Sequence, residues 1–361
     1  MTAPARAPTR ARKRPRFPVE RYLRPLRGRK AALIYTHDNP DPDSLAAALG
    51  LARLFEHELE IPVTIAHGGI VGRAQNRALV DVLGIKLVFT EKLDPSRFDL
   101  IALVDTQPET GNNSLPPGHR VDVVIDHHPP RNDSRRAPWC DVRPDLGATS
   151  TIILQYLQAR GIAVDTGLAT AFFFALRTET RDLGRESSDQ ERSAYLTLVP
   201  LVDHALLYRI THPKVPRAHF AALDRALRSA EVYRTIVAVN LGKLDYPDLV
   251  AEIADLLLSF ESAKSVFCAG VYGGSAYLSL RSEPPRRRAG AIMRSIVGEL
   301  GAAGGHGTMA GARLFGKYRS RRALDVVFEG LVARLHAEVN EELSPPQPLL
   351  PPHRRPPRPA P

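Results

Sequence analysis

The stretch Val121-Asp122-Val123-Val124-Ile125-Asp126-His127-His128 decides the fold. It is a mainly apolar run that ends in three ionisable side chains, which predicts a buried strand with ligand-binding groups at its tip. The carboxyl ends of parallel strands in an open α/β sheet point into the crevice where ligands bind. We therefore expect a central strand whose end holds metal or phosphate.

Two earlier segments have the same form. Ala31–Tyr35 is an apolar run that leads into His37-Asp38-Asn39-Pro40-Asp41-Pro42-Asp43, and Leu100–Val104 leads into Asp105. Further strands are predicted at 62–66 and 85–90, and helices at 45–59 and 73–83. Asp43 or Ser44 is the expected N-cap of the first of these helices. Continuous apolar strands between helices predict an α/β fold with a mostly parallel sheet and helices on both faces.

The second half of the chain predicts a smaller C-terminal α/β domain. Helical patterns cover 149–159, 164–178 and a segment from 189, after which Thr211–Pro216 breaks the pattern. Strands are expected at 235–240, 266–271 and 276–280, with helices at 249–260 and 289–300. We expect a metal-binding domain over 29–210, a linker over 211–232 and a substrate-binding domain over 233–340, with the active site in the cleft between the domains.

The positive charge is concentrated in an N-terminal tail. Residues 1–30 hold eleven Lys and Arg against one acidic residue, Glu20, which accounts for the whole formal net charge of +10. Pro4, Pro8, Pro15 and Pro18, together with the lack of an apolar run, predict an unstructured basic tail over 1–28, suited to weak contact with RNA. The proline-rich residues 341–361 predict a second unstructured tail.

The composition also indicates a compartment. No run approaches the roughly 20 apolar residues of a transmembrane helix, so we expect no membrane association. Cys140 and Cys268 lie far apart and give neither a disulfide framework nor zinc-ligand spacing. A reducing cytoplasm is the expected location.

The strand-end residues form a carboxylate-rich donor set with a few imidazoles. Such a set fits a hard octahedral ion, Mn²⁺ or Mg²⁺, better than zinc bound by thiolates. Two such ions suit displacement at phosphorus. The stretch from His37 to Asp43 could by itself be an Asx-capped turn, and adjacent histidines are often surface residues. The occurrence of candidate ligands at three strand ends favours the metal site.

These residues resemble the DHH phosphoesterases, which include RecJ exonuclease, nano-RNases and cyclic-dinucleotide phosphodiesterases. His37–Asp43 is similar to the first family motif, Val104-Asp105-Thr106 to the second and Asp126-His127-His128 to the third. Arg177-Thr178-Glu179-Thr180 resembles the fourth. Gly304–Gly311 is similar to the Gly-Gly-His motif of the DHH-associated C-terminal domain. The resemblance covers about residues 30–320.

The resemblance implies a role for each residue. His37, Asp41 and Asp105 would hold one manganese ion, while Asp43, Asp105, His127 and Glu179 would hold a second, with Asp105 bridging. Asp126 would orient a histidine. His128 would face the scissile phosphate and stabilise charge or protonate the leaving oxygen.

The fourth motif departs from the family pattern, which usually has Asp where this chain has Glu179. The added methylene matters because octahedral geometry is demanding. Either Glu179 reaches the second ion, or Asp182 replaces it, or that site is weakened. We favour Glu179 because its position matches the motif.

Two segments are candidates for substrate contact. Glycines let backbone N–H groups approach an anion, so Gly304, Gly305 and His306 would form a phosphate cradle; the alternative is a loop of tight turns. Arg281, followed by Ser282 at the end of an apolar strand, would grip a phosphate by resemblance. The alternative is a solvated arginine.

The expected substrate is a short nucleotide. About 290 core residues and 6% aromatic residues leave little room for a long single-strand channel. We predict a manganese-dependent hydrolase, oligoribonuclease-like, that acts on nano-RNA or 3′-phosphoadenosine 5′-phosphate through a hydroxide bridging two ions. A homodimer is left open.

Alternatives remain. The first is a phosphodiesterase for cyclic or linear dinucleotides of the c-di-AMP/pApA type. A manganese inorganic pyrophosphatase shares the DHH triplet, but the Gly-Gly-His segment and Arg281 argue for nucleotides. A non-catalytic nucleotide-binding protein is the third, if Glu179 fails to hold the second ion.

Overall fold

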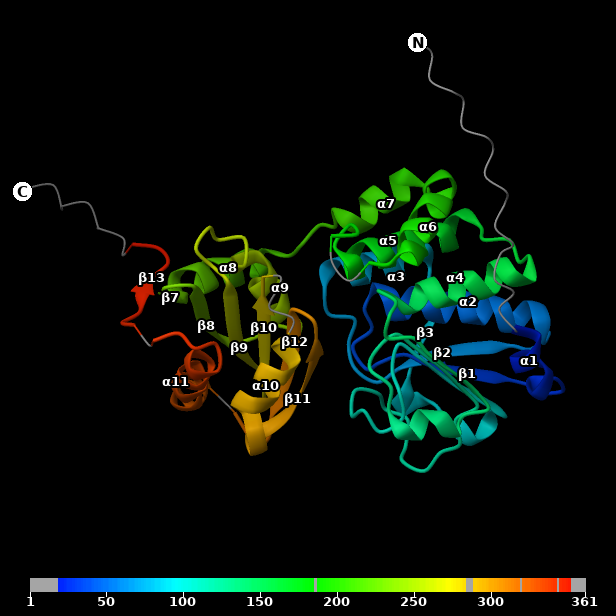
Figure 1. Cartoon of the computed structure of the whole chain (residues 1–361), viewed down its shortest axis with the longest axis horizontal. Helices are drawn as coiled ribbons and strands as arrows, with labels where there is room; N and C mark the ends of the chain where they lie inside the picture. The colour runs from blue at the N-terminus through cyan, green and yellow to red at the C-terminus, as the bar shows by residue number, and fades with distance from the viewer. Residues whose placement is uncertain (1–18, 185–186, 284–287, 319, 343, 352–361) are drawn as a thin grey trace, which may run out of the picture. The chain divides into compact units, whose positions relative to one another are not determined.

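A computed structural model describes residues 19–184, 187–283, 288–318, 320–342 and 344–351, which form two compact units (Figure 1). Unit 1 comprises the chain up to Gly69 together with Ile85–Leu207, and unit 2 comprises Ile70–Gly84 and the chain from Tyr208. The linker that we predicted over 211–232 contains helix α8 (Arg217–Ser229), where a helical stretch was expected at 219–227, and strand β7 (Glu231–Tyr233), which we did not predict.

The sheet of unit 1 is entirely parallel, in the order β3-β2-β1-β4-β5-β6. Its strands are β1 (Ala32–Tyr35), β2 (Val63–His67), β3 (Leu87–Phe89), β4 (Leu100–Val104), β5 (Val123–Asp126) and β6 (Trp139–Val142). This confirms the predicted parallel α/β sheet. The order reverses between β1 and β4, which is the position where doubly wound sheets bind ligands.

Helices cover one face of this sheet. The helices of this part of the chain are α1 (Val19–Leu23), α2 (Pro42–Glu58), α4 (Thr149–Arg160), α5 (Thr166–Thr180), α6 (Asp189–Leu198) and α7 (His204–Thr211). The central three, α2, α4 and α5, contact one another and lie together above the sheet (Figure 1). Short connecting segments cover the opposite face of the sheet. Their apolar side chains pack against strand residues such as Leu103 and Val124, and they include Leu93, Phe98 and Leu115.

The N-cap of helix α2 lies two residues before the nearer of the two N-caps that we predicted. Asp41 is the N-cap: its side chain accepts from Ser44 N at 3.0 Å, and Ser44 Oγ lies 3.1 Å from Asp41 N, completing a capping box. Pro42 then occupies the first helical position, where its fixed φ and missing N–H carry no penalty. The Asp-Pro pair was the sequence signal for this start. Capping fixes Asp41 close to the end of β1.

The predicted basic tail is shorter than 28 residues. Val19, Leu23 and Leu26 are buried. Tyr22 stacks on the fully buried Trp139, with ring centroids 5.3 Å apart and planes 4° apart. The segment from residue 19 is therefore part of unit 1, because its apolar face packs on β6. The predicted tail at residues 1–18 lies outside the described residues.

The Tyr22→Ala variant should lower the free energy of unfolding by about 1–2 kcal/mol, because an aromatic stack and its buried area are removed. Urea unfolding would measure this change. Arg24→Ala, which truncates an exposed residue of the same segment, should change stability by less than about 0.5 kcal/mol. Equal stability of the two variants would mean that the segment does not pack on Trp139.

Unit 2 contains a mixed sheet in the order β11-β12-β10-β9-β8-β7-β13. Its further strands are β8 (Ile236–Lys243), β9 (Ser265–Tyr272), β10 (Ser275–Ser282), β11 (Gly301–His306), β12 (Met309–Leu314) and β13 (Gln347–Pro348). Its further helices are α3 (Ala74–Leu83), α9 (Leu249–Leu257), α10 (Ala289–Val297) and α11 (Arg321–Glu338). One face packs on α8 and α9, and the other on α10 and α11. The separate core that we expected for the C-terminal domain is present.

Two expectations for unit 2 need correction. The Gly-rich segment, for which we considered a loop, forms strands β11 and β12 joined by a turn at Gly307. The predicted C-terminal tail is partly ordered, because Gln347 and Pro348 pair with β7; residues 352–361 lie outside the described residues. Gly290 allows the close approach of α10 to β11, because a Cβ at this position would lie 2.0 Å from the Gly305 carbonyl oxygen.

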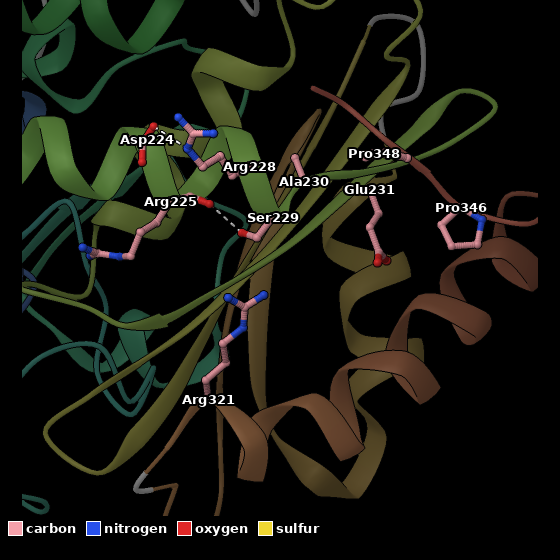
Figure 2. Close-up of a pocket in the computed structure, with 9 residues that line it drawn as sticks. All are labelled: Asp224, Arg225, Arg228, Ser229, Ala230, Glu231, Arg321, Pro346 and Pro348. Carbon is pink, nitrogen blue, oxygen red and sulfur yellow. Dashed lines mark hydrogen bonds and ion pairs between the residues drawn. The ribbon is translucent and has the colours of Figure 1, made fainter. Parts of the chain in front are cut away.

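A surface pocket of about 460 Å³ lies at the β7–β13 edge of unit 2 (Figure 2). Its lining comprises Asp224, Arg225, Arg228, Ser229, Ala230, Glu231, Arg321, Pro346 and Pro348. Asp224 pairs with Arg228 at 2.7 Å, so the lining is close to charge balance. This pocket lies at the opposite edge of the sheet from β11.

Within the described ranges, no helix combines the length and the apolar character that a membrane-spanning helix needs.

Candidate active site

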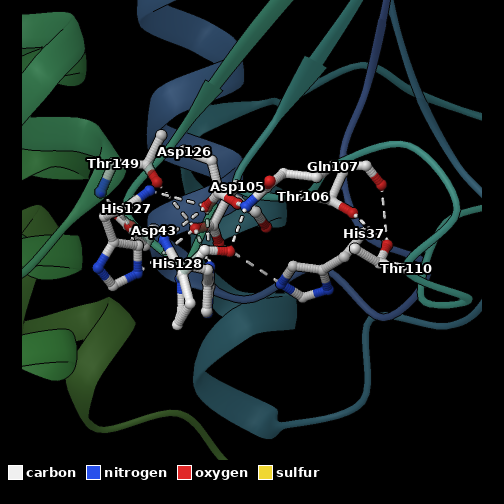
Figure 3. Close-up of polar contacts among 12 residues, drawn as sticks. His37, Asp43, Asp105, Thr106, Gln107, Thr110, Asp126, His127, His128 and Thr149 are labelled. Atoms are coloured by element: carbon white, nitrogen blue, oxygen red, sulfur yellow. Dashed lines mark hydrogen bonds and ion pairs between the residues drawn. The ribbon is translucent and has the colours of Figure 1, made fainter. Parts of the chain in front are cut away.

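The carboxyl ends of β1, β4 and β5 bring the predicted ligands together (Figure 3). Tyr35 pairs with Leu103, and Val104 pairs with Ile125, so the three strands end at the same level. The residues that follow these ends lie at one edge of the sheet. They are His37, Asp41, Asp43, Asp105, Asp126, His127 and His128.

Asp105 lies at the centre of this group. It has a left-handed backbone conformation, with φ of 58°, which is uncommon outside glycine but tolerated by Asp. Its Oδ2 lies 3.7 Å from His37 Nε2, and its Oδ1 lies 3.6 Å from His127 Nε2. The carboxylate therefore faces imidazoles on both sides. Backbone strain of this kind is often found at functional sites.

Two clusters of ligand atoms share Asp105. His37, Asp41 and Asp105 offer atoms that all lie within 4.8 Å of one another, and the same holds for Asp105, His127 and His128. His37 Nε2 is 3.5 Å from Asp41 Oδ1. The first cluster contains the three residues predicted for one ion. The second contains His128, to which we had assigned contact with the phosphate.

Besides being a candidate metal ligand, Asp43 caps the first amides of helix α4. Its Oδ2 accepts from Thr149 N at 2.7 Å, and its Oδ1 accepts from Ser150 N at 2.9 Å. Asp43 Oδ2 also lies 4.0 Å from His127 Nε2. Because each carboxylate oxygen has two lone pairs, Asp43 can accept these amides and still face a cation.

Burial and mutual repulsion make these carboxylates hard to ionise. Burial, followed by the charges of Glu179 and Asp41, raises the pKa of Asp43 to about 7. Burial and the charges of Asp43 and Asp41 raise the pKa of Asp105 well above its usual range. A cation between these groups would offset the repulsion.

Asp126 belongs to neither ligand cluster and contacts the His128 ring instead. Its Oδ1 lies 2.8 Å from His128 Nδ1 and accepts from His127 N at 2.8 Å. Burial lowers the pKa of His128, but the hydrogen bond and the charge of Asp126 raise it to about 9. The contact with Asp126 therefore favours the imidazolium form of His128 and directs its Nδ1 to Asp126. The geometry supports the orienting role that we predicted for Asp126.

Glu179 and Asp182 differ in their surroundings. After burial, the negative charge of Glu179 is the largest contribution that raises the pKa of Asp43. The same charge also raises the pKa values of Asp105 and His128. Asp182 is 58% exposed and its Oδ1 accepts from Arg177 Nε at 2.5 Å. These contacts support Glu179 rather than Asp182 as the fourth-motif acid.

The candidate substrate residues of unit 2 gather at one end of its sheet. Arg281 and His306 both pair with Met309, on either side of β12. Arg281 is not solvated, contrary to the alternative that we considered: it is 7% exposed, and its Nε donates to Asp255 Oδ1 at 2.8 Å. Gly304 and Gly305 belong to β11, and Ser282 Oγ lies 3.2 Å from Ser265 Oγ. The His306 side chain is outside the described positions.

Three site residues were missed. Thr149 Oγ1 donates to Asp105 Oδ1 at 2.9 Å. The backbone amides of Thr149 and Ser150 donate to Asp43, so the start of α4 orients both carboxylates. Gln107 Nε2 donates to Asp126 Oδ2 at 2.6 Å. Thr149 carried a signal, since it is a Thr at the start of a predicted helix. Gln107 carried none beyond its closeness to Asp105 in the sequence.

Known proteins share both the sequence and the fold. Residues 31–176 match the model of the DHH family, N-terminal domain. An uncharacterised protein of Methanocaldococcus jannaschii is 33% identical over 284 residues, which are 78% of this chain and 57% of that protein. The A-adding tRNA nucleotidyltransferase of Geobacter sulfurreducens is 27% identical over 78% of this chain and 32% of its own length.

The cyclic-di-AMP phosphodiesterase GdpP of Bacillus subtilis is 23% identical over 84% of this chain and 48% of its own length. The chain thus spans about half or less of these relatives. A solved structure, an exopolyphosphatase-related protein from Bacteroides fragilis, has a TM-score of 0.67 and 17% identity, and covers 88% of this chain and 96% of its own. Residues 31–176 of the chain thus form an N-terminal domain of the DHH family.

Proposed function

We propose that the protein is a manganese-dependent phosphodiesterase that hydrolyses short nucleotide substrates. The observation that carries this proposal is the buried Asp105 carboxylate, which is shared by two clusters of ligand atoms. Two neighbouring ions that share a carboxylate suit displacement at phosphorus. Membership of a phosphoesterase family supports the same reaction class.

The donor atoms fit manganese or magnesium. The clusters offer carboxylate oxygens and imidazole nitrogens, and the thiols are elsewhere: Cys268 is buried in unit 2, and Cys140 lies on β6. Hard octahedral ions prefer such donors. The raised pKa values of Asp43 and Asp105 also indicate a site that needs positive charge.

The two ions would share Asp105 and otherwise have separate ligands. His37, Asp41 and Asp105 would hold one, and Asp43, Asp105, His127 and Glu179 the other. The bound ions would supply Lewis acidity, which makes water a nucleophile near neutral pH and offsets charge on the phosphate. Thr149 and Ser150 would keep Asp43 and Asp105 in place through their hydrogen bonds.

His128 would act on the leaving group. Its Nδ1 is held by Asp126 at 2.8 Å, which directs the opposite ring nitrogen, Nε2, away from Asp126. Burial lowers the pKa of His128, but Asp126 raises it to about 9, which favours the protonated ring. A protonated imidazole can give its Nε2 proton to the leaving oxygen, which is general acid catalysis. Asp126 would stabilise the charged ring during the reaction.

Short nucleotides are the substrate class that we favour. Only 6% of the residues are aromatic, which disfavours the stacking platforms typical of long single-strand channels. Backbone amides of Gly304 and Gly305, with Arg281, Ser282 and His306, would contact substrate phosphates. The guanidinium of Arg281 would then serve both Asp255 and a phosphate.

Cyclic or linear dinucleotides of the c-di-AMP/pApA type are the second candidate. A relative named as a cyclic-di-AMP phosphodiesterase aligns with 84% of this chain. The two candidates share the chemistry and differ only in the substrate.

A substrate panel with manganese tests the proposal. The panel comprises a dinucleotide RNA, a 24-mer RNA, 3′-phosphoadenosine 5′-phosphate, pyrophosphate and a cyclic dinucleotide. We expect kcat/KM for the dinucleotide RNA to exceed that for the 24-mer by about tenfold or more, a difference of roughly 1.4 kcal/mol. Preference for the 24-mer or for pyrophosphate would contradict the proposal, and no hydrolysis at all would favour a nucleotide-binding protein.

A further inference from the structure

The buried amide of Gln107 joins Asp126 to the loop that follows β5. Gln107 is 1% exposed, and its Nε2 donates to Asp126 Oδ2 at 2.6 Å and to the Pro129 carbonyl oxygen at 3.1 Å. Its Oε1 accepts from Arg131 N at 2.8 Å and from Ser134 Oγ at 2.7 Å. The whole side-chain amide is therefore hydrogen bonded.

Only one orientation of this amide satisfies its neighbours. The backbone N–H of Arg131 can only donate, so Oε1 must face it. The NH₂ group then faces the Asp126 carboxylate, which can only accept while ionised. A flipped amide would set donor against donor and acceptor against acceptor, at a cost of several unmade hydrogen bonds.

The two oxygens of Asp126 have separate partners. Oδ2 accepts from Gln107, whereas Oδ1 lies 2.8 Å from His128 Nδ1 and accepts from the backbone amides of His127 and His128 at 2.8 and 3.2 Å. The Gln107 bond therefore fixes the plane of the carboxylate. Without it, Oδ2 would be a buried acceptor lacking that donor, and rotation of the carboxylate would move Oδ1 away from His128.

The backbone of Gln107 is also held. Its carbonyl oxygen accepts from Thr110 Oγ1 and from Asn113 Nδ2, each at 2.9 Å. The same loop binds the first motif, because Ser114 Oγ donates to Asp38 Oδ1 at 2.7 Å. Gln107 is thus a fixed support between the segments that carry the first and third motifs.

We propose that Gln107 is a positioning residue, which holds Asp126 so that His128 presents Nε2 to the substrate. This inference rests on the proposed function for its kinetic consequence. Gln107 touches neither the ligand clusters nor the expected substrate, so its replacement should affect turnover rather than metal content. Outer residues of this kind typically contribute 10- to 100-fold to activity.

Gln107→Met removes the amide while keeping the length of the side chain. We expect kcat to fall by about 10- to 100-fold, with KM within about twofold of wild type and two manganese ions retained. Ser134→Ala is the matched control, because it removes an equally buried hydrogen bond to Oε1 and leaves the bond to Asp126. Its kcat should stay within about twofold of wild type.

Two outcomes would overturn this role: a wild-type kcat in Gln107→Met, or a kcat that falls equally in both variants. A crystal structure of Gln107→Met supplies a readout that needs no activity. We expect His128 Nδ1 to have moved away from Asp126 Oδ1, whereas a distance still at 2.8 Å would refute the positioning role even if the wild type hydrolyses nothing in the panel. If the wild type hydrolyses nothing but His128 has moved in Gln107→Met, only the proposed function is refuted.

Discussion

Asp105→Asn should reduce kcat/KM by about 1,000-fold or more. Asp105 is the carboxylate common to both ligand clusters, so its replacement would weaken both ions at once. Loss of the several kcal/mol that such ions contribute corresponds to this factor, at 1.36 kcal/mol per tenfold change. Manganese content should fall below one ion per chain, as measured by atomic emission.

The same variant should fold normally without metal. Burial and neighbouring acids raise the pKa of Asp105 well above its usual range, so without metal the charge that the asparagine removes is already disfavoured. An asparagine of the same shape should then leave the free energy of unfolding in EDTA within about 1 kcal/mol of wild type. Asp81→Asn, at an exposed position, is the control and should change neither metal content nor activity. Substantial turnover by Asp105→Asn would refute the bridging assignment.

Glu179→Ala should reduce activity by about 100-fold or more and leave one manganese ion per chain. Glu179 is the first charge that raises the pKa of Asp43, which supports its role at the second ion. Removal of a metal-ligating carboxylate should have an effect at least as large as removal of an outer residue. Glu179→Asp, which restores the usual family residue, should keep two ions and most of the activity.

Asp182→Ala provides the comparison for Glu179. Its carboxylate pairs with Arg177 and is more than half exposed, so this variant should keep both ions and lose only a surface ion pair worth less than about 1 kcal/mol. The reverse result, two ions in Glu179→Ala and one in Asp182→Ala, would move the ligand role to Asp182.

The parallel sheet was predictable because its strands are continuous apolar runs. Leu100–Val104 and Val123–Ile125 are fully buried, and each ends at an acid that periodicity alone could locate. The end of the basic tail was not predictable in the same way. Residues 19–26 have no long apolar run, and their packing depends on a tertiary contact between Tyr22 and Trp139.

The candidate ligands were recognisable, but their supports were not. Asp105 directly follows an apolar strand, which makes it recognisable in the sequence. The hydrogen bonds of Thr149 to Asp105 and of Gln107 to Asp126 join residues 44 and 19 positions apart, so no local pattern predicts them. Strands β11 and β12 were missed for a different reason. Their glycines and alanines have low strand propensity, and the pairing of β12 with β10 and of β11 with β12 supplies the order that propensity does not.

A crystal structure of the manganese-loaded protein, with anomalous scattering recorded at the manganese edge, tests the central claim most directly. We predict two anomalous peaks on either side of Asp105, one beside His37 and Asp41 and the other beside Asp43 and His127. A single peak, or two peaks that do not share Asp105, would contradict the account.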